Sequence, residues 1–140
     1  MKIVVCTHGK SAKALVESAE MIAGKQEDII ALDFQAGGDL ANLKQNLEKE
    51  ILETEDSVLV LVDLKGGTPF NVSFPLVLQK DNAELVTGVN IAMLIELFLA
   101  RTSDIDVQEL AKMAVVSGVT SVENVSKTII DVDTNVEDGI

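Results

Sequence analysis

Five consecutive branched apolar residues, Val58 to Val62, constrain the fold of this chain more than any other feature of its sequence. A strand with one face in water alternates apolar and polar residues, and this run does not alternate. Such a run is typical of a strand buried on both faces of a parallel sheet. Because parallel neighbours need long crossover connections, usually helices, the run predicts an α/β fold with helices on both faces of the sheet.

The rest of the chain alternates runs of strand length with amphipathic stretches of helix length. Further strands are predicted at residues 2–6, 29–34, 84–87 and 128–132, and helices at 11–23, 39–51, from 68 onward, 91–100 and 106–118. The predicted helix signals are N-caps at Ser11, Asp39, Thr68 and Asp106, and stops at Gly24 and Gly118. Pro75 predicts a short or kinked third helix. We predict a doubly wound, mainly parallel open sheet whose last strand is antiparallel at the edge.

The length of 140 residues is that of one compact domain. The sequence contains no internal repeat, no low-complexity tract and no segment with the composition of a linker. We therefore expect a single domain over residues 1–132, followed by an acidic tail over residues 133–140.

Charge excludes two classes of partner. The chain carries 23 acidic and 11 basic residues, for a formal net charge of −12. A phosphate backbone or an anionic membrane surface would repel that charge, so we expect no nucleic-acid or membrane-surface binding. The single Cys and single His exclude an internal disulfide and a structural zinc site. The apolar start is too short for a signal peptide, and we expect a soluble cytoplasmic protein.

His8 and Asp63 follow the first and third predicted strands. Ligand sites of doubly wound sheets lie outside the carboxyl ends of the strands, so these two side chains should meet there. A carboxylate that accepts the Nδ1 proton of a histidine leaves Nε2 as the nucleophilic nitrogen. The plainer alternatives are a loop histidine that makes a local hydrogen bond and an aspartate that caps the following turn.

The segment from Gly66 to Pro69 joins the third strand to a predicted helix start. Backbone amides at a helix start bind anions, although a tight turn with an N-cap has the same composition. The spacing does not match the phosphate loop of nucleotide hydrolases. Lys10 and Lys65 flank the two loops, where they could attract a phosphoryl group or simply solubilise the surface. Cys6 is expected to be a small buried apolar residue.

Three motifs taken together resemble a known family. They are Thr7-His8-Gly9, the stretch from Leu61 to Asn71, and the stretch from Gly88 to Leu94. In this order, at predicted strand ends, they are similar to the IIA component of the mannose-type sugar phosphotransferase system. The resemblance covers about residues 1–120.

The resemblance implies a phosphohistidine carrier and assigns its site. His8 would take a phosphoryl group from the phosphocarrier protein HPr at Nε2 and pass it to the IIB component. Asp63 would hold the ring, while Gly9, Gly66, Gly67 and Thr68 would bind the phosphoryl group. No metal or cofactor is needed when the donor is already a phosphohistidine. The family also implies a homodimer, sometimes formed by exchange of the last strand, and indirect association with the membrane components IIC and IID.

The sequence departs from the family at Lys65 and Pro75, and four other functions are alternatives. Family members often carry an aromatic residue where Lys65 stands, and Pro75 is not expected from the family. A phosphotransfer subunit of a dihydroxyacetone kinase would share the early histidine without the string from Gly66 to Asn71. A receiver domain would use Asp63 as its acceptor, but it needs an acidic pair where Thr7-His8-Gly9 stands. A binding module that has lost transfer has no reason to keep both residues, and a hydrolase lacks a nucleophile-elbow serine.

Overall fold

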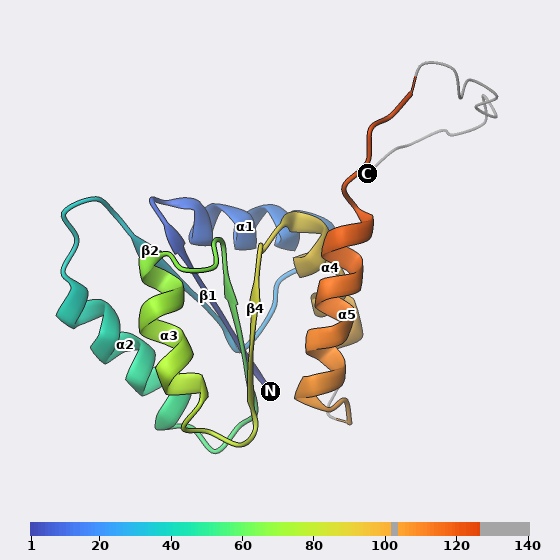
Figure 1. Ribbon diagram of the computed structural model, residues 1–140. Coiled ribbons are helices and arrows are strands. Elements are labelled where there is room, and N and C mark those ends of the chain that lie inside the picture. Colours follow the sequence, from blue (N-terminus) through green and yellow to red (C-terminus); the bar gives the residue numbers. More distant parts are fainter. Residues whose placement is uncertain (102–103, 127–140) are drawn as a thin grey trace.

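Strands and helices alternate along the chain, as the apolar pattern predicts (Figure 1). The structure is a computed structural model that describes residues 1–101 and 104–126. Its elements are β1 (Lys2–His8), α1 (Ser11–Ala23), β2 (Ile29–Phe34), α2 (Leu40–Leu52), β3 (Val58–Val62), α3 (Thr68–Val77), β4 (Ala83–Thr87), α4 (Ile91–Ala100) and α5 (Val107–Thr120).

The described strands form one parallel sheet in the order β2-β1-β3-β4. The register places Cys6 of β1 beside Val62 of β3, so these two central strands end next to each other. The last described strand, β4, lies at one edge and pairs in parallel with β3. The antiparallel strand expected at 128–132 lies outside the described residues, as does the tail at 133–140.

Helices cover both faces of the sheet, as predicted. Helices α1, α4 and α5 pack on one face, and α2 and α3 pack on the other (Figure 1). Along β1, Ile3 and Val5 face the first layer, whereas Val4 and Cys6 face the second. All five residues of β3 are fully buried, which confirms the prediction from the unbroken apolar run. Burying each such side chain contributes about 1.5–3 kcal/mol.

Several predicted helix ends are confirmed. Asp39 caps α2 by accepting a hydrogen bond from the Asn42 amide, and Asp106 caps α5 through the Gln108 amide. Gly24 ends α1 with a φ of 84°, a conformation that glycine adopts without strain. Helix α3 is short and contains Pro75.

Three predicted helix ends are wrong. The N-cap of α1 is Lys10 rather than Ser11, because the Ser11 hydroxyl donates to the His8 carbonyl instead. The N-cap of α3 is Gly67, so Thr68 is the first helical residue. Helix α5 continues through Gly118 to Thr120. A Cβ on Gly118 would lie 2.7 Å from Cε of Met93, so this glycine lets α5 approach α4 closely rather than ending the helix.

Two apolar side chains near helix ends lie outside the core. Ile22 on α1 is 45% exposed and Leu40 on α2 is 52% exposed, whereas Leu43 and Leu47, which share the apolar face of α2, are buried. Within the part of the chain that the structure describes, no helix combines the length and apolarity needed to cross a membrane.

Candidate functional site

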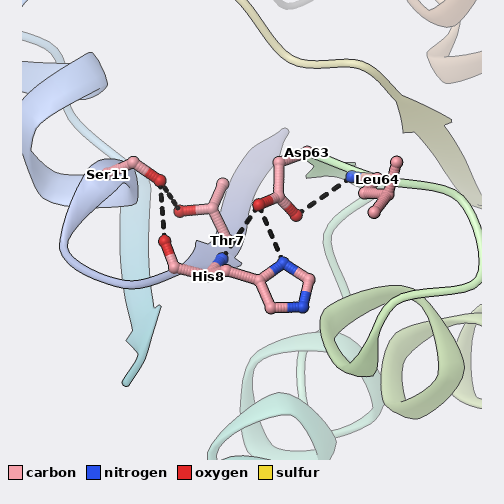
Figure 2. A network of polar contacts seen from close by, with 5 residues as sticks. All are labelled: Thr7, His8, Ser11, Asp63 and Leu64. Carbon is pink, nitrogen blue, oxygen red and sulfur yellow. Dashed lines mark hydrogen bonds and ion pairs between the residues drawn. The ribbon is translucent and has the colours of Figure 1, made fainter. Parts of the chain in front are cut away.

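The sheet brings His8 and Asp63 together because β1 and β3 are neighbours in which Cys6 pairs with Val62, so the residues that follow lie side by side. His8 is the last residue of β1, and Asp63 directly follows β3. Oδ2 of Asp63 accepts a hydrogen bond from the His8 backbone amide at 3.0 Å and lies 2.9 Å from Nδ1 of the ring (Figure 2). Its other oxygen, Oδ1, accepts from the Leu64 amide at 3.0 Å. The carboxylate is thus fixed from two sides.

This geometry selects one tautomer of the imidazole. An ionised carboxylate only accepts hydrogen bonds, so Nδ1 carries the proton and Nε2 keeps its lone pair. The side chain of His8 is 43% exposed, which leaves Nε2 open to a reacting group from outside the protein. The ring therefore presents a nucleophilic nitrogen at an exposed edge of the molecule.

The hydrogen bonds also keep Asp63 ionised. Its partial burial acts to raise the pKa, since burial disfavours a charged carboxylate. The hydrogen bonds from the His8 amide and ring, together with the attraction of His8, outweigh that effect. The pKa of Asp63 lies below its usual value as a result.

A second network supports the backbone of His8 from the side of α1. The Ser11 hydroxyl donates to the His8 carbonyl at 2.9 Å, and Oγ of Ser11 lies 2.7 Å from Oγ1 of the fully buried Thr7 (Figure 2). Since the single hydroxyl proton of Ser11 is used, Thr7 is the donor in the second bond. The support that Thr7 and Ser11 give is not among the features predicted from the sequence. Their spacing of four residues across the strand end is the signal that could have found it.

The predicted phosphoryl-binding residues follow the ends of β1 and β3 in the chain, and they differ in what they offer. The Gly9 amide donates to the Phe34 carbonyl at 2.8 Å, and the Gly67 amide donates to the Leu64 carbonyl at 3.2 Å. In the described part of the chain, the amides of Thr68 and Phe70, at the start of α3, have no hydrogen-bond partner. First-turn amides of this kind bind anions.

Asn71 is a further residue that the sequence analysis left without a role. Its side-chain Nδ2 donates to the Gly66 carbonyl at 3.0 Å, and its backbone amide donates to the Gly67 carbonyl at 2.9 Å. Asn71 thus ties the glycine loop to the first turn of α3. Its place one turn after the glycine pair was the available signal.

The neighbouring residues show no second nucleophile. Burial raises the pKa of the Cys6 thiol to about 12, and the nearby Asp63 and Asp33 carboxylates act in the same direction. The thiol is therefore protonated and inert, as expected of a buried apolar residue. Lys10 and Lys65 are exposed beside the two loops. Among the residues described, no group of three or more His, Cys, Asp or Glu side chains is placed to hold a metal ion.

This chain matches a family model over most of its length. A family model described as "PTS system fructose IIA component" matches residues 2–115. The mannose-specific EIIAB component of Escherichia coli (strain K12) is 42% identical over 118 residues, which are 83% of this chain and 36% of that protein. This chain thus spans about a third of the length of that relative.

Shorter relatives and solved structures match over most of their own length. The fructose-specific EIIA component of Bacillus subtilis (strain 168) is 30% identical over 103 residues, which are 72% of this chain and 70% of that protein. The mannose/sorbose-specific IIA subunit from Enterococcus faecalis superposes with a TM-score of 0.81 at 30% identity, covering 89% of this chain and 94% of that one.

Proposed function

Because this chain belongs to the fructose IIA component family of the PTS, the sugar phosphotransferase system, we propose that it is a phosphohistidine carrier. It accepts a phosphoryl group from phospho-HPr on Nε2 of His8 and passes it to the IIB component, in support of sugar uptake and phosphorylation. One observation carries the proposal: Asp63 lies 2.9 Å from Nδ1 while the ring stays 43% exposed.

The transfer step needs only groups that the site contains. The Nε2 lone pair attacks phosphorus, the N–P bond of the donor phosphohistidine breaks, and its electron pair stays on the donor nitrogen. The phosphorylated ring keeps its Nδ1 proton and becomes cationic, so the Asp63 carboxylate stabilises it. Because both bonds are between nitrogen and phosphorus, the step is reversible at little cost, as a carrier requires.

The start of α3 would hold the transferred group. The amides of Thr68 and Phe70 and the hydroxyl of Thr68 would donate to phosphoryl oxygens. Gly9, Gly66 and Gly67 would leave room for the group because they carry no side chains. Phosphoryl transfer depends mainly on positioning and on stabilising charge, and fixed amides supply both. Lys10 and Lys65 add positive charge beside the two loops.

The carrier role implies protein partners and a location. HPr and IIB would dock in turn over the exposed face around His8, and IIB would link the carrier indirectly to IIC and IID. These partners place the exchange in the cytoplasm. The phosphotransfer domain would comprise residues 1–132.

A homodimer is the proposed assembly, and the edge of the sheet supports it. An edge strand presents unpaired backbone groups that a second chain can bind, and β4 is such a strand in the described sheet. Beside it, a groove of about 590 Å³ runs between β4 and α5 and includes the exposed Val115 and Val116. Apolar side chains in that position favour burial against a partner chain.

Intact-mass spectrometry after incubation with phosphoenolpyruvate, enzyme I and HPr tests the proposed function. Wild type should gain one phosphoryl group that is lost in acid and survives hydroxylamine, and His8→Ala should gain none. Adding IIB should return the carrier to its unphosphorylated mass. A hydroxylamine-labile adduct that persists in His8→Ala would move the acceptor to a carboxylate, as in a receiver domain. The absence of any adduct on wild type would overturn the carrier role.

A further inference from the structure

We propose that Gly67 is a positioning residue for His8. Because residue 67 has no side chain, the imidazole ring has the space it needs to keep the hydrogen bond between its Nδ1 and Asp63. The inference rests on the proposed carrier function and adds to it the residue that sets the orientation of the reacting nitrogen.

The ring of His8 occupies the place that a side chain on residue 67 would take. A Cβ built on Gly67 would lie 2.5 Å from Cε1 and 3.1 Å from Nε2 of His8. Non-bonded carbon atoms pack best at about 3.5–4.0 Å, and real Cβ atoms essentially never approach a neighbour closer than 3.0 Å, so the ring and a Cβ cannot both keep these positions. A larger side chain would also crowd Nε2 itself.

The requirement for glycine at position 67 comes from space and not from the backbone. Gly67 has φ −76° and ψ 171°, an extended conformation open to any residue. Its neighbour Gly66 shows the opposite case, because its φ is 83° and a Cβ there would meet no atom within 4 Å. Position 66 thus requires glycine for its backbone conformation, whereas position 67 requires it for the space beside the ring.

The loop is fixed more firmly than the ring. The Gly67 amide donates to the Leu64 carbonyl, the Gly67 carbonyl accepts from the Asn71 amide, and Asn71 also holds the Gly66 carbonyl. Asp63 cannot follow a displaced ring, because the amides of His8 and Leu64 hold its two oxygens. A side chain at position 67 would therefore move the exposed imidazole away and break its Nδ1 hydrogen bond.

Loss of that bond would change which nitrogen carries the proton. Free imidazole side chains favour the Nε2–H tautomer, which protonates the nitrogen that must attack phosphorus. The displaced ring would also leave the line of attack set by the start of α3. Misplacement of a reacting group by about 1 Å costs on the order of 100-fold in rate.

The test compares Gly67→Ala with wild type and with Gly66→Ala in two measurements on the full chain. Nitrogen-15 NMR of the unphosphorylated protein reports the ring tautomer, and rapid-quench assays with phospho-HPr report the rate of phosphoryl uptake. Gly67→Ala should fold with a melting temperature close to wild type, lose the Nδ1–H tautomer and take up phosphoryl about 100-fold more slowly. Gly66→Ala should keep the wild-type tautomer while its melting temperature falls by about 3 °C.

Each outcome bears on the proposal. The proposal is overturned if Gly67→Ala keeps both the wild-type tautomer and the wild-type rate. It is also overturned if this variant fails to fold, because the added Cβ is expected to displace the ring and leave the fold intact. If Gly66→Ala also lost the Nδ1–H tautomer, the cause would be a change in the loop backbone and not the space at residue 67. That result would also overturn the proposal. A wild-type protein that has the Nδ1–H tautomer but accepts no phosphoryl group would refute the carrier function alone.

Discussion

At the residue scale, the chemistry of this molecule rests on how three backbone segments confine one imidazole ring. Asp63 fixes Nδ1, Ser11 fixes the His8 carbonyl, and Gly67 of the glycine loop lies close to Cε1 of the ring. None of these groups is unusual by itself. Their combination leaves a single nitrogen, Nε2, both unprotonated and accessible, which is what a reversible phosphoryl carrier needs.

The lowered pKa of Asp63 predicts how stability depends on pH. A carboxyl group whose pKa is lower in the folded state contributes stability above its unfolded pKa and loses it as the pH falls through the folded pKa. Wild type should therefore be more stable than Asp63→Asn at about pH 7, and the difference should shrink as the pH falls below about 4. Thermal unfolding of both proteins between about pH 7 and pH 3 measures this. A difference independent of pH would show that the ionised form of Asp63 is not stabilised by folding.

Much of the site could be predicted from the sequence, and the part that could not depends on side-chain geometry. His8 and Asp63 were found because strand ends of a parallel sheet meet at one edge. The contact between Gly67 and the ring follows from the rotamer of His8, which no sequence pattern encodes. The support from Asn71 was missed for the same reason, since it depends on which carbonyl its side chain reaches.

At the scale of elements, Arg101 ties the ends of three of them together. Following α4, its guanidinium donates to the carbonyls of Met1, Glu27 and Asp28, which precede β1 and β2. Arg101→Ala should lower the free energy of unfolding by about 1–3 kcal/mol, because it removes hydrogen bonds from a charged donor. Denaturant unfolding measures the loss.

Lys25→Ala is the matched control for Arg101. It removes an ion pair with Glu20 whose lysine side chain is 88% exposed, and exposed pairs of this kind are screened by solvent. Its unfolding midpoint should equal that of wild type. If Arg101→Ala were also indistinguishable from wild type, the guanidinium would contribute nothing to holding these ends together.

Element order was predictable because hydrophobic periodicity is a strong local signal, whereas three helix ends were not. Ser11 lies where a cap is expected, but its hydroxyl finds the His8 carbonyl instead. Gly118 has the composition of a helix stop, yet it is needed where α5 crosses close to Met93 of α4. A local side-chain bond decides the first case and a tertiary contact the second, each between options that the sequence leaves equal.

At the scale of the whole molecule, the exposed edge at β4 and α5 predicts self-association. Light scattering coupled to size exclusion should give about twice the chain mass of 15.0 kDa. Val116→Glu should shift the protein toward monomer, because it places a charge among the apolar side chains of the groove between β4 and α5. Leu78→Glu is the control, since Leu78 is also exposed but lies at the end of α3. A wild-type monomer, or equal effects of both variants, would contradict this interface.

The central claim is that Asp63 holds Nδ1 so that Nε2 of His8 carries the phosphoryl group. Phosphorus-31 and nitrogen-15 NMR of the labelled protein, after phosphorylation through HPr, tests it most directly because coupling between the two nuclei identifies the bonded nitrogen. The account predicts phosphorus on Nε2 and a proton on Nδ1. Phosphorus on Nδ1, or on the Asp63 carboxylate with an unmodified ring, would contradict it.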